Sequence, residues 1–73
     1  MMDKETWKNW QFVCTRYRDV RDGKLYEIFG LWPDWQLHAD HYWHEISEEG
    51  ISKGEHHGPF RESSEAELDL WSR

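Results

Sequence analysis

The chain lacks the cysteines and the long apolar segments that cross-link small proteins or hold them in membranes. Cys14 is its only cysteine, so neither an internal disulfide nor a cysteine-rich zinc site can form. The longest apolar run, residues 28–32, is far shorter than the roughly 20 residues that a membrane-spanning helix needs. Residues 1–6 are polar and hold no apolar core of a signal peptide. We therefore expect a cytoplasmic protein that makes no membrane contact.

Basic residues are also scarce. Nine Lys and Arg face fifteen Asp and Glu, which gives a net charge of −6. Because affinity for nucleic acid rests on clustered Lys and Arg, direct binding of nucleic acid is not expected. Residues 1–39 carry six acids and six bases, whereas residues 40–73 carry nine acids and three bases. The entire net charge therefore belongs to the second half of the chain.

Aromatic residues, by contrast, are abundant: six Trp, three Tyr and three Phe among 73 residues. Disordered acidic segments are poor in aromatic residues, so we expect one small folded domain over residues 1–73. Such a domain buries only about 60% of its unfolded surface, and we expect most tryptophans to serve its core. No phosphate-binding glycine loop, HExxH motif or nucleophile motif is present. We expect a protein that is not an enzyme and holds no cofactor.

The first half reads as a β-hairpin. Residues 10–18 and 24–32 are rich in aromatic and β-branched side chains, and Asp22-Gly23 between them is a preferred type I′ turn. A two-residue loop would, however, place Arg21 opposite Lys24, a like-charge pair, so a longer loop stays open as an alternative. In either case both faces of the hairpin carry apolar residues. That excess is a first indication of a binding surface.

The second half is less regular. Residues 35–46 fit either a third strand or a helix, and we favour the strand, while residues 47–62 are predicted to form a long loop. Ser64-Glu-Ala-Glu67 has the form of a capping box, followed by the pairs Ala66/Leu70 and Leu68/Trp71 at helical spacing. The predicted fold is therefore α+β: a small antiparallel sheet of two or three strands, with a short C-terminal helix docked on it.

Three histidines, His38, His41 and His44, form the most evident candidate for a metal site. On a helix, a spacing of three places all of them on one broad face, and Zn²⁺ prefers imidazole ligands. On a strand, His41 points away from the other two. Since a strand is favoured, we predict no metal site, and a histidine-based metal-binding domain remains the second alternative function.

The composition fits association with another macromolecule better than turnover of a small molecule. Trp and Arg dominate binding hot spots, and carboxylates steer encounter with a basic surface. The expected partner surface comprises Trp7, Arg16, Arg18, Arg21, Trp32, Trp35, Trp43, Glu48, Glu49 and Trp71. A first alternative is mimicry of nucleic acid, in which acids such as Glu45, Glu55 and Glu62 occupy the groove of a DNA-binding protein.

In size, acidity and tryptophan content the whole chain resembles small phage-encoded host-takeover proteins, among them inhibitors of bacterial RNA polymerase. This resemblance is one of type and aligns no residues. It implies a non-enzymatic regulator that acts in the host cytoplasm, binds RNA polymerase as its larger partner and interferes with transcription.

Overall fold

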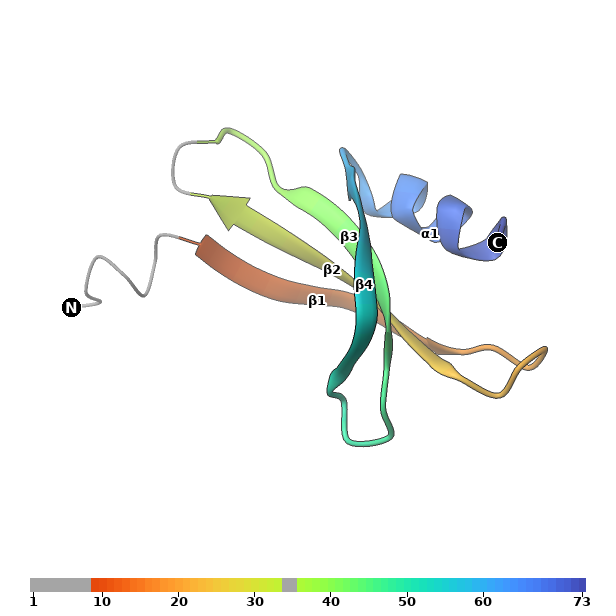
Figure 1. Ribbon diagram of the computed structural model, residues 1–73. Helices are drawn as coiled ribbons and strands as arrows, with labels where there is room; N and C mark the ends of the chain where they lie inside the picture. The colour runs from red at the N-terminus through yellow and green to blue at the C-terminus, as the bar shows by residue number, and fades with distance from the viewer. Residues whose placement is uncertain (1–8, 34–35) are drawn as a thin grey trace.

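The structure, a computed structural model, describes residues 9–33 and 36–73. They form one antiparallel sheet and one helix, with the strands side by side in chain order (Figure 1). The elements are β1 (Asn9–Arg18), β2 (Leu25–Pro33), β3 (Asp40–Ile46), β4 (Ser52–Phe60) and α1 (Ser63–Trp71). The α+β class agrees with the prediction, but the sheet has four strands rather than two or three. Within the described ranges, no helix has the length and apolar character needed to cross a membrane.

A six-residue connection, residues 19–24, joins β1 to β2. Arg18 pairs with Leu25, so the two-residue loop is wrong and the longer alternative is correct. A type I′ turn needs positive φ at both central residues, whereas among the described residues only glycines, Gly23 included, have positive φ. The backbone N–H of Gly23 instead donates to the carbonyl of Asp19 at 2.7 Å.

The longer loop and a bulge at Cys14 also change which residues share a face. Arg16 lies opposite Glu27, and Tyr17 lies opposite Tyr26. The predicted register had placed Arg16 beside Phe29 instead. Cys14 itself is exposed at the bulge. This register brings a basic and an acidic side chain together on one face, which becomes important below.

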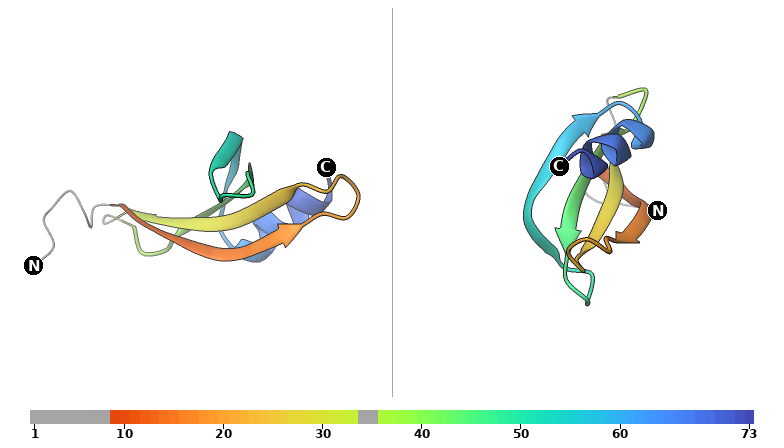
Figure 2. Two further views of the ribbon diagram at one scale, coloured as in Figure 1. Left: turned by 90° about the horizontal axis from the view of Figure 1, so that it is seen from below. Right: turned by 90° about the vertical axis from the view of Figure 1, so that its right-hand side faces the viewer.

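The segment predicted as a long loop, residues 47–62, contains β4. The prediction missed this strand because Gly, Pro, Lys and Glu, which have low β-propensity, make up most of its sequence. Its pairing is irregular: Glu45 opposes Lys53 and Trp43 opposes His57, so three β4 residues face the single β3 residue between them. These irregularities bend β4 across the end of the sheet (Figures 1 and 2).

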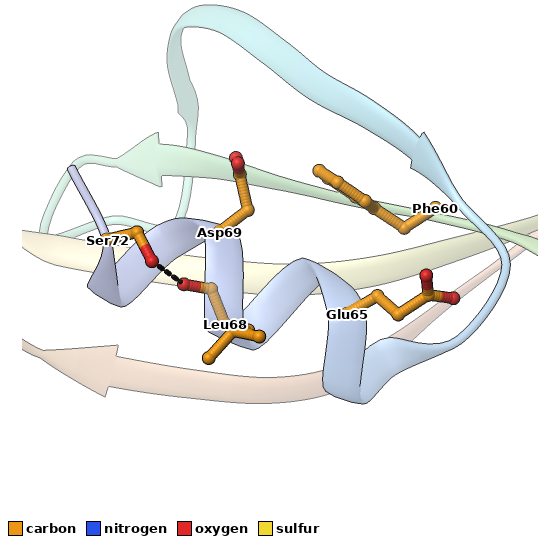
Figure 3. A pocket seen from close by; sticks show the side chains of 5 residues that line it. All are labelled: Phe60, Glu65, Leu68, Asp69 and Ser72. Atoms are coloured by element: carbon orange, nitrogen blue, oxygen red, sulfur yellow. Dashed lines mark hydrogen bonds between the residues drawn. The ribbon is translucent and has the colours of Figure 1, made fainter.

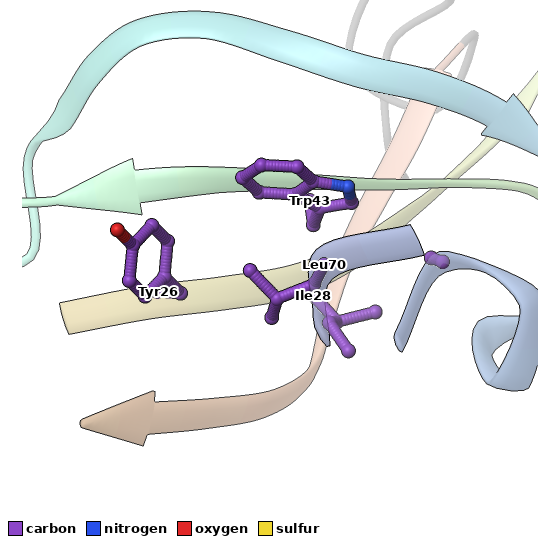
Figure 4. Close-up of a cluster of buried hydrophobic side chains, with 5 residues drawn as sticks. Tyr26, Ile28, Trp43 and Leu70 are labelled. Carbon is purple, nitrogen blue, oxygen red and sulfur yellow. The ribbon is translucent and has the colours of Figure 1, made fainter. Parts of the chain in front are cut away.

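The hydrophobic core lies between α1 and one face of the sheet. Tyr26, Ile28 and Trp43 from the sheet pack with Ala66 and Leu70 from the helix (Figure 4). Ile28, Ala66 and Leu70 are at most 1% exposed. The predicted spacing of Ala66 and Leu70 therefore does identify the buried side of the helix, which an isolated nine-residue segment could not stabilise alone.

The capping box spans Glu62–Glu65, two residues earlier than the predicted box Ser64–Glu67. Glu62, in an extended conformation, is the N-cap. The backbone N–H of Glu62 donates a hydrogen bond to the carboxylate of Glu65 at 3.1 Å. The second pair, Leu68/Trp71, stays outside the buried core. Leu68 is 70% exposed, and Trp71 is 38% exposed and packs edge-on against Tyr17 of β1.

The opposite face of the sheet is covered from within the chain. Phe29 is 1% exposed because Tyr42 stacks on it at 5.5 Å between ring centroids and His56 of the curled β4 lies edge-on at 4.9 Å. In Figure 2 the start of β4 and helix α1 lie on opposite sides of the β1–β2 ribbon. This part of the hairpin's apolar surface is therefore used in folding, whereas Val13 and Trp32 stay 50% and 42% exposed.

Candidate functional site

The hairpin tip, residues 19–24, is organised around a buried carboxylate. The side chain of Asp19 is 2% exposed and accepts hydrogen bonds from the guanidinium groups of Arg21 at 2.8 Å and Arg73 at 2.6 Å. These bonds, above all those from Arg21, hold the pKa of Asp19 far below its ordinary value. Arg73 also lies 4.1 Å from the ring centroid of Tyr26, so the end of the chain is fastened to the tip.

The three predicted binding arginines all have acidic partners inside the chain. Arg16 donates to Glu27 at 2.8 Å, and Arg18 donates to both carboxylate oxygens of Glu48 at 2.9 and 3.0 Å. Arg21 is bound to the tip carboxylate described above. Each of these arginines stays about half-exposed. They form part of the surface, with their charges neutralised by these acids.

Of the five predicted binding tryptophans, Trp7 and Trp35 lie outside the described residues. Trp32 is 42% exposed, and its indole N–H donates to a backbone carbonyl of the following loop at 3.1 Å. Trp71 is 38% exposed and packs edge-on against Tyr17. Glu49, like Glu48, is exposed in the β3–β4 turn. These residues remain available for contact.

The placement of Trp43 on a partner surface is wrong. It is 5% exposed because it lies beneath α1, where its indole N–H donates to the carboxylate of Asp69 at 2.8 Å. On its other side it stacks on His57 with ring centroids 3.9 Å apart. Trp43 therefore connects β3, β4 and α1 within the core.

An open groove of about 280 Å³ runs along the outer side of α1 (Figure 3). Phe60 at the end of β4 and Leu68 supply its apolar surface, and Glu65, Asp69 and Ser72 supply its polar surface. The hydroxyl of Ser72 donates to the carbonyl of Leu68 at 2.7 Å, which completes the last turn of the helix. The groove thus combines apolar walls with carboxylates.

The helix beside this groove carries charge of one sign. Glu65, Glu67 and Asp69 are acidic, the N-cap Glu62 is acidic, and no basic residue occurs between Ser63 and Trp71. Among the described residues, none of these four acids forms an ion pair. In the β3–β4 region, Glu45 and Glu48 form ion pairs with neighbouring bases, whereas Glu49 and Glu55 form none among the described residues.

On the opposite face of the sheet, a chain of polar side chains runs from the interior to the surface. Glu27 and His44, each 4% exposed, are joined by a 2.9 Å contact between Oε1 and Nε2. Ser52 Oγ lies 2.9 Å from Nδ1 of the same imidazole and 3.4 Å from Nε2 of His56. Burial alone would raise the pKa of Glu27, but the bonds from His44 and Arg16 outweigh it and leave that pKa lowered.

The predicted histidine trio is not brought together. β3 places His41 and His44 on opposite faces, as expected for a strand, and Nδ1 of His41 lies 3.1 Å from the carbonyl oxygen of Arg61. His38 is exposed in the loop before β3. No group of three or more His, Cys, Asp or Glu side chains in residues 9–33 and 36–73 is arranged to hold a metal ion.

Sequence reasoning missed two parts of the candidate sites. Phe60 was taken only as part of the boundary before the helix, although it lines the groove. Ser52 lay in the segment taken for a loop. One signal was available: Glu27 stands between apolar neighbours in a predicted strand, and a buried acid needs a partner on an adjacent strand. The sequence did not reveal that His44 is that partner, because no local pattern indicates how β2 pairs with β3.

The chain was compared with protein-family models, with curated protein sequences and with solved structures, and no match was found in any of the three comparisons.

Proposed function

We propose that this protein is a small non-enzymatic regulator that binds a larger protein through the outer side of α1. The observation that carries the proposal is the groove lined by Phe60, Glu65, Leu68, Asp69 and Ser72, beside a helix that bears acids and no base. Leu68 is 70% exposed, on the side of the helix opposite the buried Ala66 and Leu70.

The charge of the helix specifies the chemistry of the partner. Carboxylates beside an apolar groove complement a segment that carries an apolar anchor flanked by Lys or Arg. Because the acids of α1 have no ion pairs with the described residues, their field is available to steer a basic segment during encounter. Trp71 at the end of the helix adds an exposed aromatic side chain of the kind that dominates hot spots.

The specific form of the proposal is a phage-type inhibitor that binds host RNA polymerase in the bacterial cytoplasm. Its support is the resemblance in size, acidity and tryptophan content. A basic, apolar segment of a polymerase subunit would enter the groove, and the bound regulator would interfere with transcription.

The test is direct binding to purified bacterial RNA polymerase, measured by calorimetry with and without sigma factor. Leu68→Ala should weaken binding at least about tenfold, the equivalent of roughly 1.4 kcal/mol. The matched control is Leu37→Ala, which removes the same atoms from a side chain that is 96% exposed in the β2–β3 loop. Equal affinity of Leu68→Ala and the unmodified protein would contradict the groove as the docking site, and no binding to polymerase would reject that partner.

The acidic nucleic-acid mimic remains the alternative, supported by the one-signed charge of α1. Affinity that rests on carboxylates alone falls steeply with salt, since exposed charges are screened beyond about 10 Å at 0.1 M ionic strength. An interface with Leu68 and Trp71 at its centre should keep most of its affinity. A titration at low and moderate salt therefore separates the two proposals.

A further inference from the structure

The polar chain on the face opposite α1 has the geometry of an activated nucleophile. Ser52 Oγ, His44 and Glu27 follow one another at 2.9 and 2.9 Å. A nucleophile within hydrogen-bond reach of a base, which is itself oriented by a third group, is the arrangement that activates serine in acyl transfer. In the Ser-His-Asp triad of serine proteases, Nε2 faces the hydroxyl and Nδ1 faces the acid. In His44 the order is reversed, since Nδ1 faces the hydroxyl and Nε2 faces the acid.

Glu27 determines the directions of the hydrogen bonds among Ser52, His44 and Glu27. Its lowered pKa keeps it as a carboxylate, which can only accept hydrogen bonds. When His44 is neutral, its Nε2 therefore carries the proton and donates a hydrogen bond to Glu27, which leaves Nδ1 as an acceptor. The hydroxyl of Ser52 then donates to Nδ1, so the base is in the tautomer that can remove the serine proton.

The base is held in place on every side. Arg16 donates to the second carboxylate oxygen of Glu27 at 2.8 Å, which fixes the acid. The ring of His44 lies 4.5 Å from that of Phe29 and 4.7 Å from that of His56, measured between centroids. Ser52, in contrast, is exposed at the first residue of β4. A buried, oriented base thus meets a hydroxyl that a reagent can reach.

We propose that Ser52 is an activated nucleophile that accepts an acyl group from small activated esters. Its Oγ forms a bond to the ester carbonyl carbon while Nδ1 of His44 takes the hydroxyl proton. The carbon–oxygen bond to the leaving alcohol then breaks, and that alcohol leaves with the proton returned by His44. Nε2 of His56 also lies 3.4 Å from Oγ. The product is one acyl ester per molecule, a stoichiometric modification that does not depend on the proposed binding function.

The first experiment uses the unmodified protein and needs no variant. It is incubated with p-nitrophenyl acetate, quenched in acid at short times, and the acetylated residues are mapped by peptide mass spectrometry. Ser63 and Ser64 are internal controls, because they are exposed serines with no histidine partner. General-base assistance contributes about 10²–10⁴-fold, so Ser52 should be acetylated at least about 100-fold faster than either control. Equal rates at the three serines would overturn the proposal.

Variants then assign the roles. Ser52→Ala should abolish the fast phase of p-nitrophenol release, and His44→Gln should slow acetylation of Ser52 about 100-fold and remove its dependence on pH. Glu27 is a positioning residue, so Glu27→Gln should slow the reaction and alter the pH profile while circular dichroism stays that of the folded protein. A folded His44→Gln variant that keeps the fast phase would exclude His44 as the base.

Discussion

Truncation of Leu70 should separate the stabilising side of α1 from its exposed side. Leu70 is 0% exposed and packs on Ile28 and Trp43, the sheet residues of the core. Leu70→Ala removes most of this side chain and leaves a cavity between helix and sheet. Leu68→Ala makes the same chemical change two residues earlier on the same helix, where the side chain is 70% exposed. The two variants share the same small gain in helix propensity, so their difference reports burial.

The expected magnitude is large for a protein of this size. A buried Leu→Ala substitution costs about 2–5 kcal/mol, and a domain of 73 residues has a total stability of roughly 4–11 kcal/mol. Leu70→Ala should therefore remove about a fifth of the stability or more. With a shift of about 4–8 °C per kcal/mol, its Tm should fall by at least about 8 °C. Leu68→Ala should stay within about 0.5 kcal/mol of the unmodified protein.

The assay is urea unfolding followed by tryptophan fluorescence, with circular dichroism as a second probe of two-state behaviour. Because Trp43 is buried against α1, its emission should report the loss of helix docking. If Leu68→Ala destabilised the protein as much as Leu70→Ala, the assignment of the inner and outer sides of α1 would be wrong. The groove proposal would then also lose its basis, since Leu68 would be serving the fold.

Three further predictions concern pH and backbone conformation. Because the pKa of Asp19 is lowered in the fold, this carboxylate stabilises the fold above its unfolded pKa of about 3.9, and the stabilisation is lost as the pH falls below that value. Asp19→Asn should therefore be less stable at pH 7, and its Tm should change less between neutral and acid pH. Burial, and then the charges of the adjacent imidazoles, lower the pKa of His56, so the fold should lose stability as the pH falls below about 6.5; His56→Gln should reduce that slope, whereas the exposed His38→Gln should not. Gly58 has φ +145°, and an added Cβ would lie 2.7 Å from a backbone oxygen, so Gly58→Ala should lower the urea midpoint more than Gly54→Ala, which has positive φ but open space around it.

The local sequence pattern was sufficient to predict the segments whose structure depends on residues close together in the chain. The hairpin strands follow from runs of aromatic and β-branched side chains, and the buried side of α1 follows from Ala66 and Leu70 at i and i+4. The preference for a strand over a helix in residues 35–46 is correct for β3, residues 40–46. In these segments periodicity and propensity point to the same structure.

The rest depended on contacts between distant residues. β4 has little β-propensity of its own and forms because its backbone pairs with β3 and its His56 covers Phe29. At the tip loop, the buried carboxylate of Asp19 is bound by the nearby Arg21 and also by Arg73, 54 residues away in the chain. The pairing of β4 and the contact with Arg73 have no local signature. The candidate sites were missed for the same reason, since the chain from Ser52 to Glu27 joins three strands.

The folded chain also changes the meaning of its uneven charge. The neutral first half and the acidic second half do not form two surfaces, because ion pairs cross between them: Arg18 with Glu48, Lys24 with Glu45, and Arg73 with Asp19. These pairs neutralise acids around the tip and the β3–β4 turn. The acids of α1 receive no such partner among the described residues. The ion pairs therefore leave the acids of α1, beside the groove that Leu68 lines, without a neutralising base, as they also leave Glu49 and Glu55.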